Sequence, residues 1–386
     1  MRIAIFNAVQ LETAGGMEHF CIQTAAHLSG LDGVQADCVT MTDAFNLRYG
    51  QLHSLYFLRQ FDRSTIYRET RESIEARLGQ ARYRKYADFN ELTQALGQYD
   101  LVYSRNEITE AFLLHSLVGY QRIPPVIFGC HCPHRYVGAS TLHSRLHNQL
   151  YASPLYSRLA KRVAGFHTIS RGDTLAIQQQ FPRHPVEAIP NPFDAAGYAE
   201  RAKKTAPLFS VDAKRFNILW AGRLTEQKGV TELCQLITDV NKTHTDKVAW
   251  HICGEGEMST AIAKTAAEHK NVKTHGHIDC EAMPGAYACA DLFVTTSLWG
   301  ETYAYTPREA NSLGLPVVSF DISGCNEIIE HGVNGKLAGT QAEFASHVRW
   351  FADGNQLATN IKKHIHAKTN ATAAYQQLLH FFRRCL

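Results

Sequence analysis

The stretch FNILWAGRLTEQKG, residues 216–229, decides the fold of the second half of this chain. Its first six residues form an apolar run of strand length, and Gly222 follows that run directly. A glycine here lets the backbone turn from a buried strand towards a helix, with peptide N–H groups pointing outwards. The stretch therefore predicts a strand–turn–helix unit of a parallel sheet covered by helices.

The same alternation of short apolar runs and longer helical patterns recurs along the whole chain. The predicted strands cover residues 2–6, 36–40, 101–104, 125–129 and 165–169 in the first half, and 216–221, 248–253, 272–275, 292–295 and 316–320 in the second. This order predicts an α/β fold with two doubly wound parallel sheets. In such sheets ligands bind at the carboxyl ends of the strands.

The two halves are predicted to meet near IPNPFD, residues 189–194, because its two prolines exclude helix and favour an extended crossing. A polar stretch follows. We predict a first domain over 1–195, a linker over 196–215, a second domain over 216–365 and a last helix over 366–386.

Composition excludes several classes of protein. The 386 residues are 45% hydrophobic and 19% charged, which indicates a globular rather than a disordered chain. The net charge of +3 is too balanced for a dedicated nucleic-acid-binding protein. No apolar run reaches the length of a membrane-spanning helix, and the N-terminus resembles a buried strand rather than a signal peptide. Ten cysteines without a CxxC pair favour a reduced, cytoplasmic protein.

A basic segment with a helical pattern covers residues 59–85, where Lys and Arg outnumber Asp and Glu. One interpretation is a solvated helix face. The other is contact with an anionic acceptor or with the inner face of a membrane.

Two cations follow the strand at 216–221. Arg223 can donate a planar fork to a phosphate, and Lys228 supplies a second positive charge. Two cations at a strand end suit a diphosphate, whose negative charge grows as a bond to it breaks. The alternative is that the two cations lie on the protein surface and bind no ligand.

Two further patterns lie downstream. Gly254 and Gly256 end the strand WHIC in a GxG turn, which allows either close approach of a nucleotide or a tight turn without a ligand. Glu301 and Glu309 follow, with Pro307 predicting the first turn of a helix that contains Glu309. The two carboxylates could bind neighbouring hydroxyls of a sugar and a ribose, or simply face solvent.

These patterns occur in one order with GLPVV (314–318) and EHGVNG (330–335). The series resembles the donor domain of the family 4 glycosyltransferases, retaining enzymes of the two-Rossmann GT-B architecture. The match is specific across 216–340, and IPNPFD is similar to the family's IPNGVD. The resemblance implies an N-terminal acceptor-binding domain and a C-terminal nucleotide-sugar-binding domain facing each other across a deep cleft. It also implies that the C-terminal helix crosses back to the N-terminal domain.

The resemblance implies roles for individual residues of the second half. Arg223 and Lys228 would hold the donor diphosphate and stabilise it as a leaving group without a metal, close to Gly254. Glu309 would bind the ribose, and Glu301 the transferred sugar. No DxD motif, the usual metal–diphosphate ligand of other glycosyltransferases, is found in the chain.

Between the two glutamates the sequence departs from the family pattern. Tyr303, Ala304 and Tyr305 are predicted donor contacts, but Ala304 stands where the family commonly has glycine, and Pro307 removes one backbone donor. The departure leaves the identity of the donor sugar open.

In the first half, Gly15 and Gly16 resemble the family's Gly-Gly loop, although a lone pair of glycines also suits a flexible turn. His131 follows a predicted strand and, by resemblance, would face the donor sugar, with His134 as the second candidate. The surrounding CHCPH, residues 130–134, leaves a packed loop histidine and a zinc site as alternatives.

Arg105 and Arg171 lie at predicted strand ends. Each could contact the acceptor or form a structural ion pair.

The hypothesis is that this protein is a cytoplasmic, metal-independent, retaining glycosyltransferase without cofactors. It would move a sugar from a UDP- or GDP-linked donor to a hydroxyl acceptor. The acceptor would be a glycan or lipid-linked saccharide of cell-envelope polysaccharide or lipopolysaccharide biosynthesis. The alternatives are a non-hydrolysing sugar-nucleotide epimerase of the same architecture and a catalytically idle sugar-nucleotide-binding subunit.

Overall fold

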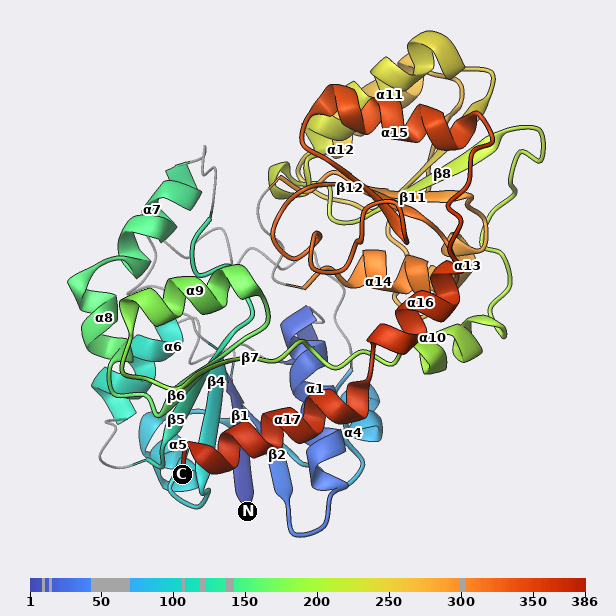
Figure 1. Ribbon diagram of the computed structural model, residues 1–386. Coiled ribbons are helices and arrows are strands. Elements are labelled where there is room, and N and C mark those ends of the chain that lie inside the picture. The colour runs from blue at the N-terminus through green and yellow to red at the C-terminus, as the bar shows by residue number, and fades with distance from the viewer. Residues whose placement is uncertain are drawn as a thin grey trace. The chain divides into compact units, whose positions relative to one another are not determined.

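The computed structural model separates into two compact units (Figure 1). The structure describes residues 1–8, 11–13, 16–42, 70–105, 108–118, 123–136, 142–298 and 303–386. Within these, unit 1 consists of Met1–Arg135, Ser140–Asn191 and Thr372–Leu386, and unit 2 contains Pro192–Ala371. The last helix of the chain therefore belongs to the unit that also holds the N-terminus.

Unit 1 is built on a parallel sheet with the strand order β3-β2-β1-β4-β5-β6-β7. Its strands are β1 (Arg2–Asn7), β2 (Gln35–Met41), β3 (Tyr83–Tyr86), β4 (Leu101–Arg105), β5 (Val126–Cys130), β6 (Gly165–Thr168) and β7 (Val186–Ala188). Its helices are η1 (Leu11–Thr13), α1 (Gly16–Ser29), α4 (Arg71–Leu78), α5 (Phe89–Leu96), α6 (Ile108–Phe112), the π-helix η2 (Leu113–Val118), α7 (Leu142–Tyr151), α8 (Pro154–Ala160), α9 (Arg171–Gln180) and α17 (Ala371–Arg384).

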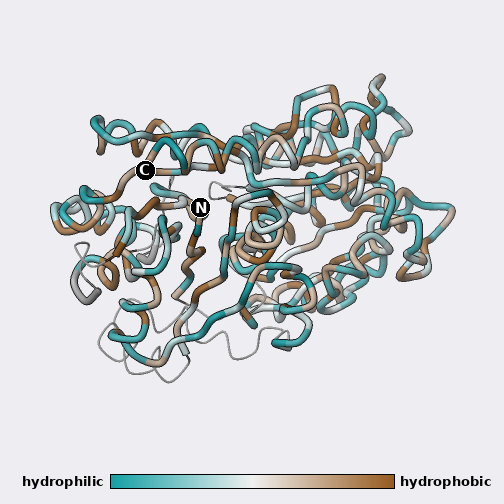
Figure 2. The backbone as a smooth tube through the Cα atoms, turned by 90° about the horizontal axis from the view of Figure 1, so that it is seen from below, coloured by the Kyte–Doolittle hydropathy of each residue, from teal (hydrophilic) through white to brown (hydrophobic). Residues whose placement is uncertain are grey.

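The sheet of unit 1 has a hydrophobic core on each face. Along β1, Ile3 and Ile5 pack with α1, α4 and α17, whereas Ala4 and Phe6 pack on the opposite face with α5, α6, α8 and α9. Successive strand residues point to opposite faces, so a strand buried on both sides needs an unbroken apolar run. The covering helices instead alternate hydrophilic and hydrophobic residues, as the teal and brown stretches of Figure 2 show.

Unit 2 repeats this plan with the strand order β10-β9-β8-β11-β12-β13. Its strands are β8 (Phe216–Ala221), β9 (Val248–Cys253), β10 (Val272–Thr274), β11 (Leu292–Thr295), β12 (Val317–Phe320) and β13 (Gly335–Ala338). Its helices are α10 (Ala195–Ala202), η3 (Glu226–Lys228), α11 (Val230–His244), α12 (Ser259–Glu268), α13 (Met283–Tyr287), α14 (Tyr305–Ser312), α15 (Gln341–Ala352) and α16 (Ile361–Lys368). Helices α11, α12 and α15 cover one face, and α10, α13, α14 and α16 the other.

Each sheet contains one point where the chain reverses the direction in which it adds strands. In unit 1 this switch lies between β1 and β4, and in unit 2 between β8 and β11. The connections that leave the two neighbouring strands diverge there, which opens a crevice at their carboxyl ends. The topology therefore places the loops after β8 and β11 where a ligand of unit 2 is expected.

The α/β fold with two parallel sheets is confirmed, but the basic segment over 59–85 is not one helix. Residues 59–69 lie outside the described residues, Arg71–Leu78 form α4, and Tyr83–Tyr86 form the edge strand β3. Gly79 follows α4 with a φ of 58°, which is outside the range of a right-handed helix, so the helix ends there. Glycine suits this position because few other residues adopt a positive φ. In the part of the chain that the structure describes, no helix has the length and apolarity needed to span a membrane.

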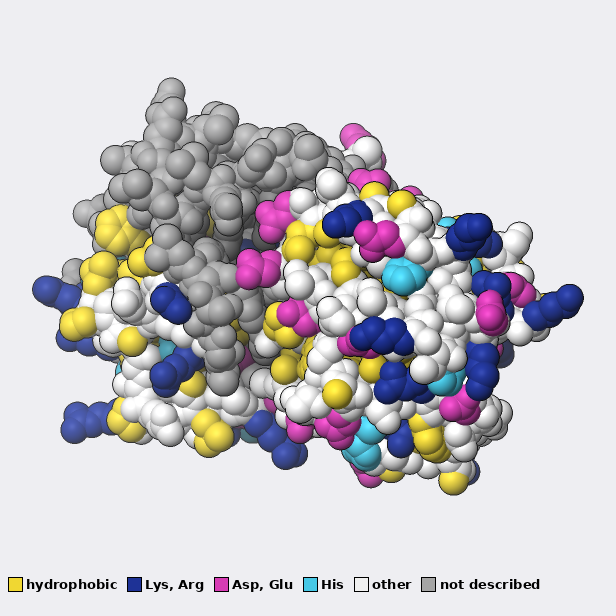
Figure 3. All heavy atoms as spheres, turned by 90° about the horizontal axis from the view of Figure 1, so that it is seen from above, with side chains coloured by type: hydrophobic (Ala, Val, Ile, Leu, Met, Phe, Trp, Pro, Cys, Tyr) yellow, Lys and Arg dark blue, Asp and Glu magenta, His cyan; other side chains and the backbone are white. Residues whose placement is uncertain are grey.

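Three described cations of the basic segment, Arg71, Arg84 and Lys85, form ion pairs with carboxylates of unit 1. Arg71 pairs with Glu75, and Arg84 with the buried Asp37 at 3.3 Å. In the right-hand part of the face drawn in Figure 3, Lys and Arg side chains are interspersed with Asp and Glu. This part of the segment fits the solvated-face interpretation; contact with a membrane stays a prediction.

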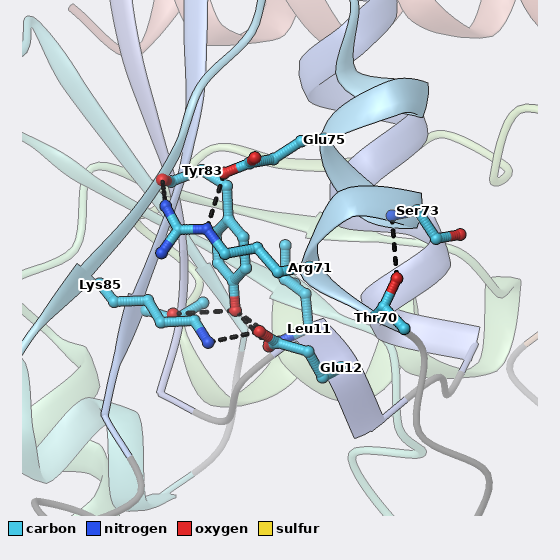
Figure 4. A network of polar contacts seen from close by, with 9 residues as sticks. Leu11, Glu12, Thr70, Arg71, Ser73, Glu75, Tyr83 and Lys85 are labelled. Carbon is cyan, nitrogen blue, oxygen red and sulfur yellow. Dashed lines mark hydrogen bonds and ion pairs between the residues drawn. The ribbon is translucent and has the colours of Figure 1, made fainter.

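A polar network attaches η1 to the edge strand β3 (Figure 4). The Tyr83 hydroxyl donates to Glu12 Oε2 at 2.6 Å and accepts from the Leu11 N–H at 3.1 Å. Lys85 forms an ion pair with the same carboxylate, of which only 15% is exposed. The network therefore anchors η1 to β3.

We expect Glu12→Gln to lower the free energy of unfolding by about 1–2 kcal/mol, because two hydrogen bonds to a charged acceptor weaken. Burial acts to raise the pKa of Glu12, but the hydrogen bonds from Lys85 and Tyr83 leave it lowered. The carboxylate therefore stabilises the fold above its unfolded pKa of about 4.3 and loses this effect as the pH falls through its lower folded pKa. Urea unfolding at pH 7 and pH 3 should show the difference only at pH 7; Glu75→Gln, in an exposed pair, should change little at either.

Candidate active site

The loops after β8 and β9 are joined by backbone hydrogen bonds at the carboxyl edge of the unit 2 sheet. The Gly222 N–H donates to the Cys253 carbonyl at 3.0 Å, and the Leu224 N–H donates to the Glu255 carbonyl at 2.9 Å. These bonds continue the pairing of the two strands beyond their ends. The GRLTEQKG stretch is thus held rigidly against the GxG turn.

The glycines of the GxG turn are required by this contact between two backbones. Gly254 has a φ of 141°, and a Cβ there would lie 1.8 Å from the Gly222 carbonyl oxygen. A Cβ on Gly256 would lie 2.4 Å from the Leu224 carbonyl oxygen. The close contact between the two backbones therefore requires glycines in this turn, in agreement with the tight-turn interpretation. Contact of Gly254 with a donor stays a prediction.

The loop after β11 closes on the other side of the same turn. Thr296 donates from its hydroxyl to the Lys228 carbonyl at 2.9 Å and accepts from Trp220 Nε1 at 3.0 Å. Gly229, with a φ of 67°, packs its Cα against the Thr296 carbonyl. The backbone of the candidate phosphate-binding turn is therefore fixed from both neighbouring loops.

The two candidate phosphate ligands lie on this fixed backbone: Arg223 precedes η3, and Lys228 belongs to it. Arg223 is exposed, and Lys228 is half-buried at the last residue of η3. Both follow β8 at the switch point of the sheet. Two cations on a preorganised turn at a strand end suit an anionic ligand of the diphosphate class.

Glu309 lies in the second turn of α14, the helix that follows β11. Its carboxylate accepts a hydrogen bond from the Tyr287 hydroxyl at 2.8 Å. Burial raises the pKa of Glu309 to about 7, against the lowering effect of that hydrogen bond. A carboxylate that ionises near neutral pH, on the helix that follows a strand at the switch point of a sheet, is a candidate functional group. Its predicted companion Glu301 lies outside the described residues.

Residues at the start of α14 are packed rather than open. Tyr303 is 7% exposed, with the Arg308 guanidinium 4.0 Å from its ring centroid and the Tyr305 ring 4.6 Å away. Ala304 is the N-cap residue and Pro307 lies in the first turn, as expected from the sequence. A donor contact of Tyr303, Ala304 or Tyr305 stays a prediction.

In unit 1, Gly15 lies outside the described residues, and Gly16 is the first residue of α1. His131 directly follows β5, is half-buried, and lies with its ring centroid 4.3 Å from that of Phe20. Its Nε2 is 2.7 Å from the Tyr103 hydroxyl. Burial and the neighbouring His167 and Arg105 lower the pKa of His131 well below its usual value, so the ring is neutral at physiological pH.

The second histidine candidate lies in a different environment. His134 is 5% exposed and packs between Tyr151 and Tyr156, with its Nε2 2.8 Å from Gln180 Oε1. Cys130 is buried whereas Cys132 is exposed. Within the described ranges, no three His, Cys, Asp or Glu side chains are grouped as a metal site requires.

The two arginine candidates differ in their surroundings. Arg105 is 7% exposed, and its Nε lies 3.4 Å from Oε1 of Glu110. This contact is a structural ion pair, one of the two alternatives that the sequence left open for Arg105. Arg171 is exposed and is the first residue of α9, directly after the N-cap residue Ser170. Acceptor contacts of either residue stay predictions.

Two models of glycosyltransferase domains match this chain. The model "Glycosyltransferase Family 4" matches residues 14–196, and "Glycosyl transferases group 1" matches residues 215–353. The chain belongs to the family 4 glycosyltransferases. The resemblance inferred from the motifs is thus confirmed at the level of the family.

Curated relatives of this family 4 chain match it over part of their length. Spore coat protein SA of Bacillus subtilis is 29% identical over 128 residues, 31% of this chain and 34% of that protein. The amylovoran biosynthesis glycosyltransferase AmsK of Erwinia amylovora is 31% identical over 183 residues, 43% of this chain and 44% of that protein. The chain thus spans well under half of the curated relatives that it matches.

Solved structures share the whole GT-B fold with this family 4 chain. Anabaena HepE in complex with UDP superimposes with a TM-score of 0.72 at 19% identity, covering 98% of this chain and 99% of that one. Sucrose-phosphate synthase from Thermosynechococcus elongatus gives 0.70 at 16% identity, covering 100% and 98%. At these identities the likeness concerns the fold.

Several residues that build the site were not identified from the sequence. Thr296 supports the Lys228 backbone, and Tyr287 binds Glu309. Tyr103 and His167 surround His131. None of them belongs to a spaced motif; the available signal was the position of Tyr103, His167 and Thr296 in or next to predicted strands.

Proposed function

We propose that this protein is a metal-independent, retaining glycosyltransferase that moves a sugar from a UDP-linked donor to a hydroxyl acceptor. One observation carries the proposal: Arg223 and Lys228 lie in the connection after β8, and Glu309 lies on α14, the helix after β11, and these two strands flank the switch point of unit 2. Cations for a diphosphate and a carboxylate for ribose hydroxyls are thus carried by the two connections between which ligands bind in such sheets. The similar HepE structures are complexes with UDP and with UDP-glucose, which favours uridine.

In the proposed reaction the bond between the anomeric carbon and the diphosphate oxygen breaks as the acceptor oxygen attacks from the same face. The acceptor proton passes to the leaving phosphate oxygen, and UDP is released. Arg223 and Lys228 stabilise the charge that develops on the diphosphate, and this would replace a metal ion. Unit 1 supplies the acceptor-binding residues.

The acceptor is proposed to be a saccharide or lipid-linked saccharide of a cell-envelope polysaccharide, reached in the cytoplasm. Two relatives favour this class: AmsK is named for amylovoran biosynthesis, and a Klebsiella pneumoniae relative for its place in a cps region. The Klebsiella protein is 29% identical over 129 residues.

A binding and slow-hydrolysis screen of UDP-, GDP- and ADP-linked sugars tests the proposal. We expect binding and slow hydrolysis with a UDP-sugar, unchanged by EDTA, and a product whose anomeric configuration equals that of the donor. Conversion of the donor into its epimer without an acceptor would instead identify an epimerase. Binding without turnover in the presence of envelope extracts would identify an idle subunit.

Donor affinity should depend on pH through Glu309. Ribose hydroxyls donate to the ionised carboxylate, so donor binding competes with the proton that Glu309 takes up below pH 7. We expect the Kd for a UDP-sugar to rise about tenfold between pH 8 and pH 6 in calorimetric titrations. Glu309→Gln should bind more weakly at pH 8 and show no such rise; parallel pH curves for the two proteins would contradict the role of Glu309.

A further inference from the structure

A hydrogen-bonded series in unit 1 crosses four adjacent strands and ends on a backbone carbonyl. The Tyr103 hydroxyl, from β4, lies 2.7 Å from Nε2 of His131, which follows β5. The same hydroxyl lies 2.7 Å from Nδ1 of His167 on β6. His167 Nε2 lies 2.7 Å from the carbonyl oxygen of Ile189, which follows β7.

The series is built into the core of the unit. Tyr103 and His167 are 0% and 1% exposed. Gly129 makes room for the tyrosine hydroxyl, because a Cβ there would lie 1.9 Å from Tyr103 Oη. Phe20 packs against the ring of His131. Few alternative positions are therefore open to the three side chains.

Donor and acceptor roles follow from the carbonyl at the end. The Ile189 carbonyl can only accept, so His167 Nε2 carries a hydrogen. Burial lowers the pKa of His167 to about 4, so its ring is neutral and its Nδ1 is an acceptor. The Tyr103 hydrogen is then donated to His167, and the Tyr103 oxygen accepts from His131 Nε2–H.

We propose that Tyr103 and His167 are positioning residues that hold His131 as its Nε2–H tautomer, with Nδ1 as the acceptor nitrogen of the ring. A neutral acceptor nitrogen suits a hydroxyl or an N–H group rather than a phosphate oxygen, which has no hydrogen to donate. The tautomer follows from unit 1 alone.

Nitrogen-15 NMR of the full-length protein with labelled histidine tests the tautomer without any turnover. His131→Gln identifies the signals of His131. We expect an unprotonated Nδ1 and a protonated Nε2 in the wild type from pH 6 to pH 8. A wild-type His131 with its hydrogen on Nδ1 would overturn the proposal.

Two variants separate positioning from a purely structural role. Tyr103→Phe removes both hydrogen bonds, so His131 should become a mixture of tautomers. His167→Phe leaves the Tyr103 hydroxyl with only the His131 ring to donate to, so His131 should invert to the Nδ1–H tautomer. Tyr99→Phe, which removes a buried hydroxyl bound to Asp37 at 2.9 Å, should leave the wild-type tautomer. An unchanged His131 in both Tyr103→Phe and His167→Phe would overturn the proposal.

Kinetics test whether the tautomer of His131 matters to transfer, and this part rests on the proposed function. We expect Tyr103→Phe and His167→Phe to lower kcat/KM for transfer about tenfold, the equivalent of one hydrogen bond, with thermal unfolding verifying that each variant is folded. Normal transfer by variants with an altered tautomer would refute a role of Tyr103 and His167 in positioning His131 for the reaction. Absence of transfer in the wild type would refute the proposed function but leave the NMR result standing.

Discussion

Arg223→Ala and Lys228→Ala are each expected to lower the transfer rate by a factor of about 10²–10³. In the proposed reaction each removes a positive group from the place where the leaving diphosphate gains charge, and such groups act mainly on the transition state. The loss should appear in kcat as well as in donor affinity. Steady-state kinetics with a UDP-sugar and calorimetric binding of the same donor separate the two effects.

The chain offers matched controls at the opposite end of the same sheet. Arg215 precedes β8, whereas Arg223 follows it. Lys247 precedes β9 and pairs with the exposed Asp353 at 2.6 Å. Arg215→Ala and Lys247→Ala remove the same charges from unit 2 but leave the carboxyl edge intact, so both should retain near-normal transfer. Equal losses in all four variants would point to net charge and contradict the assignment of the phosphate site.

The sequence predicted those strands that are buried on both faces. Residues 216–221 form β8 and residues 248–253 form β9, because a central strand of a parallel sheet is an uninterrupted apolar run. The edge strand β3 was missed: YRKY carries two cations that are partly exposed, and the neighbouring helical pattern of α4 extended into it. The edge strand β7 was missed as well, because its three residues, VEA, include a charge and none of them is fully buried.

The site was predictable where its residues stand in spaced motifs. Arg223 and Lys228 fall in the connection after β8, and Glu309 falls on α14, the helix after β11. Their supports were not predictable, because contacts such as Tyr287 with Glu309 join residues of separate elements. Register within a helix and packing between loops decide such contacts, and neither leaves a pattern along the chain.

Gly229→Ala is expected to destabilise unit 2 by about 3–5 kcal/mol and to abolish donor binding. A Cβ on residue 229 would lie 1.8 Å from the Thr296 carbonyl oxygen and 2.7 Å from its carbon. Relief requires the loops after β8 and β11 to separate, since the clash is with backbone rather than with a flexible side chain. The movement would break the hydrogen bond from Thr296 to the Lys228 carbonyl and displace the two cations.

Gly33→Ala isolates the conformational part of this effect. Gly33 has a φ of 71°, close to the 67° of Gly229, but nothing lies within 4 Å of a Cβ placed there. Its substitution should cost about 1 kcal/mol, the strain of a left-handed alanine alone. Urea-unfolding midpoints measure both variants, and donor binding should survive only in Gly33→Ala. If Gly229→Ala lost no more stability than Gly33→Ala, the loops after β8 and β11 would have to be free to separate, and the rigid phosphate turn proposed for catalysis would lose its physical basis.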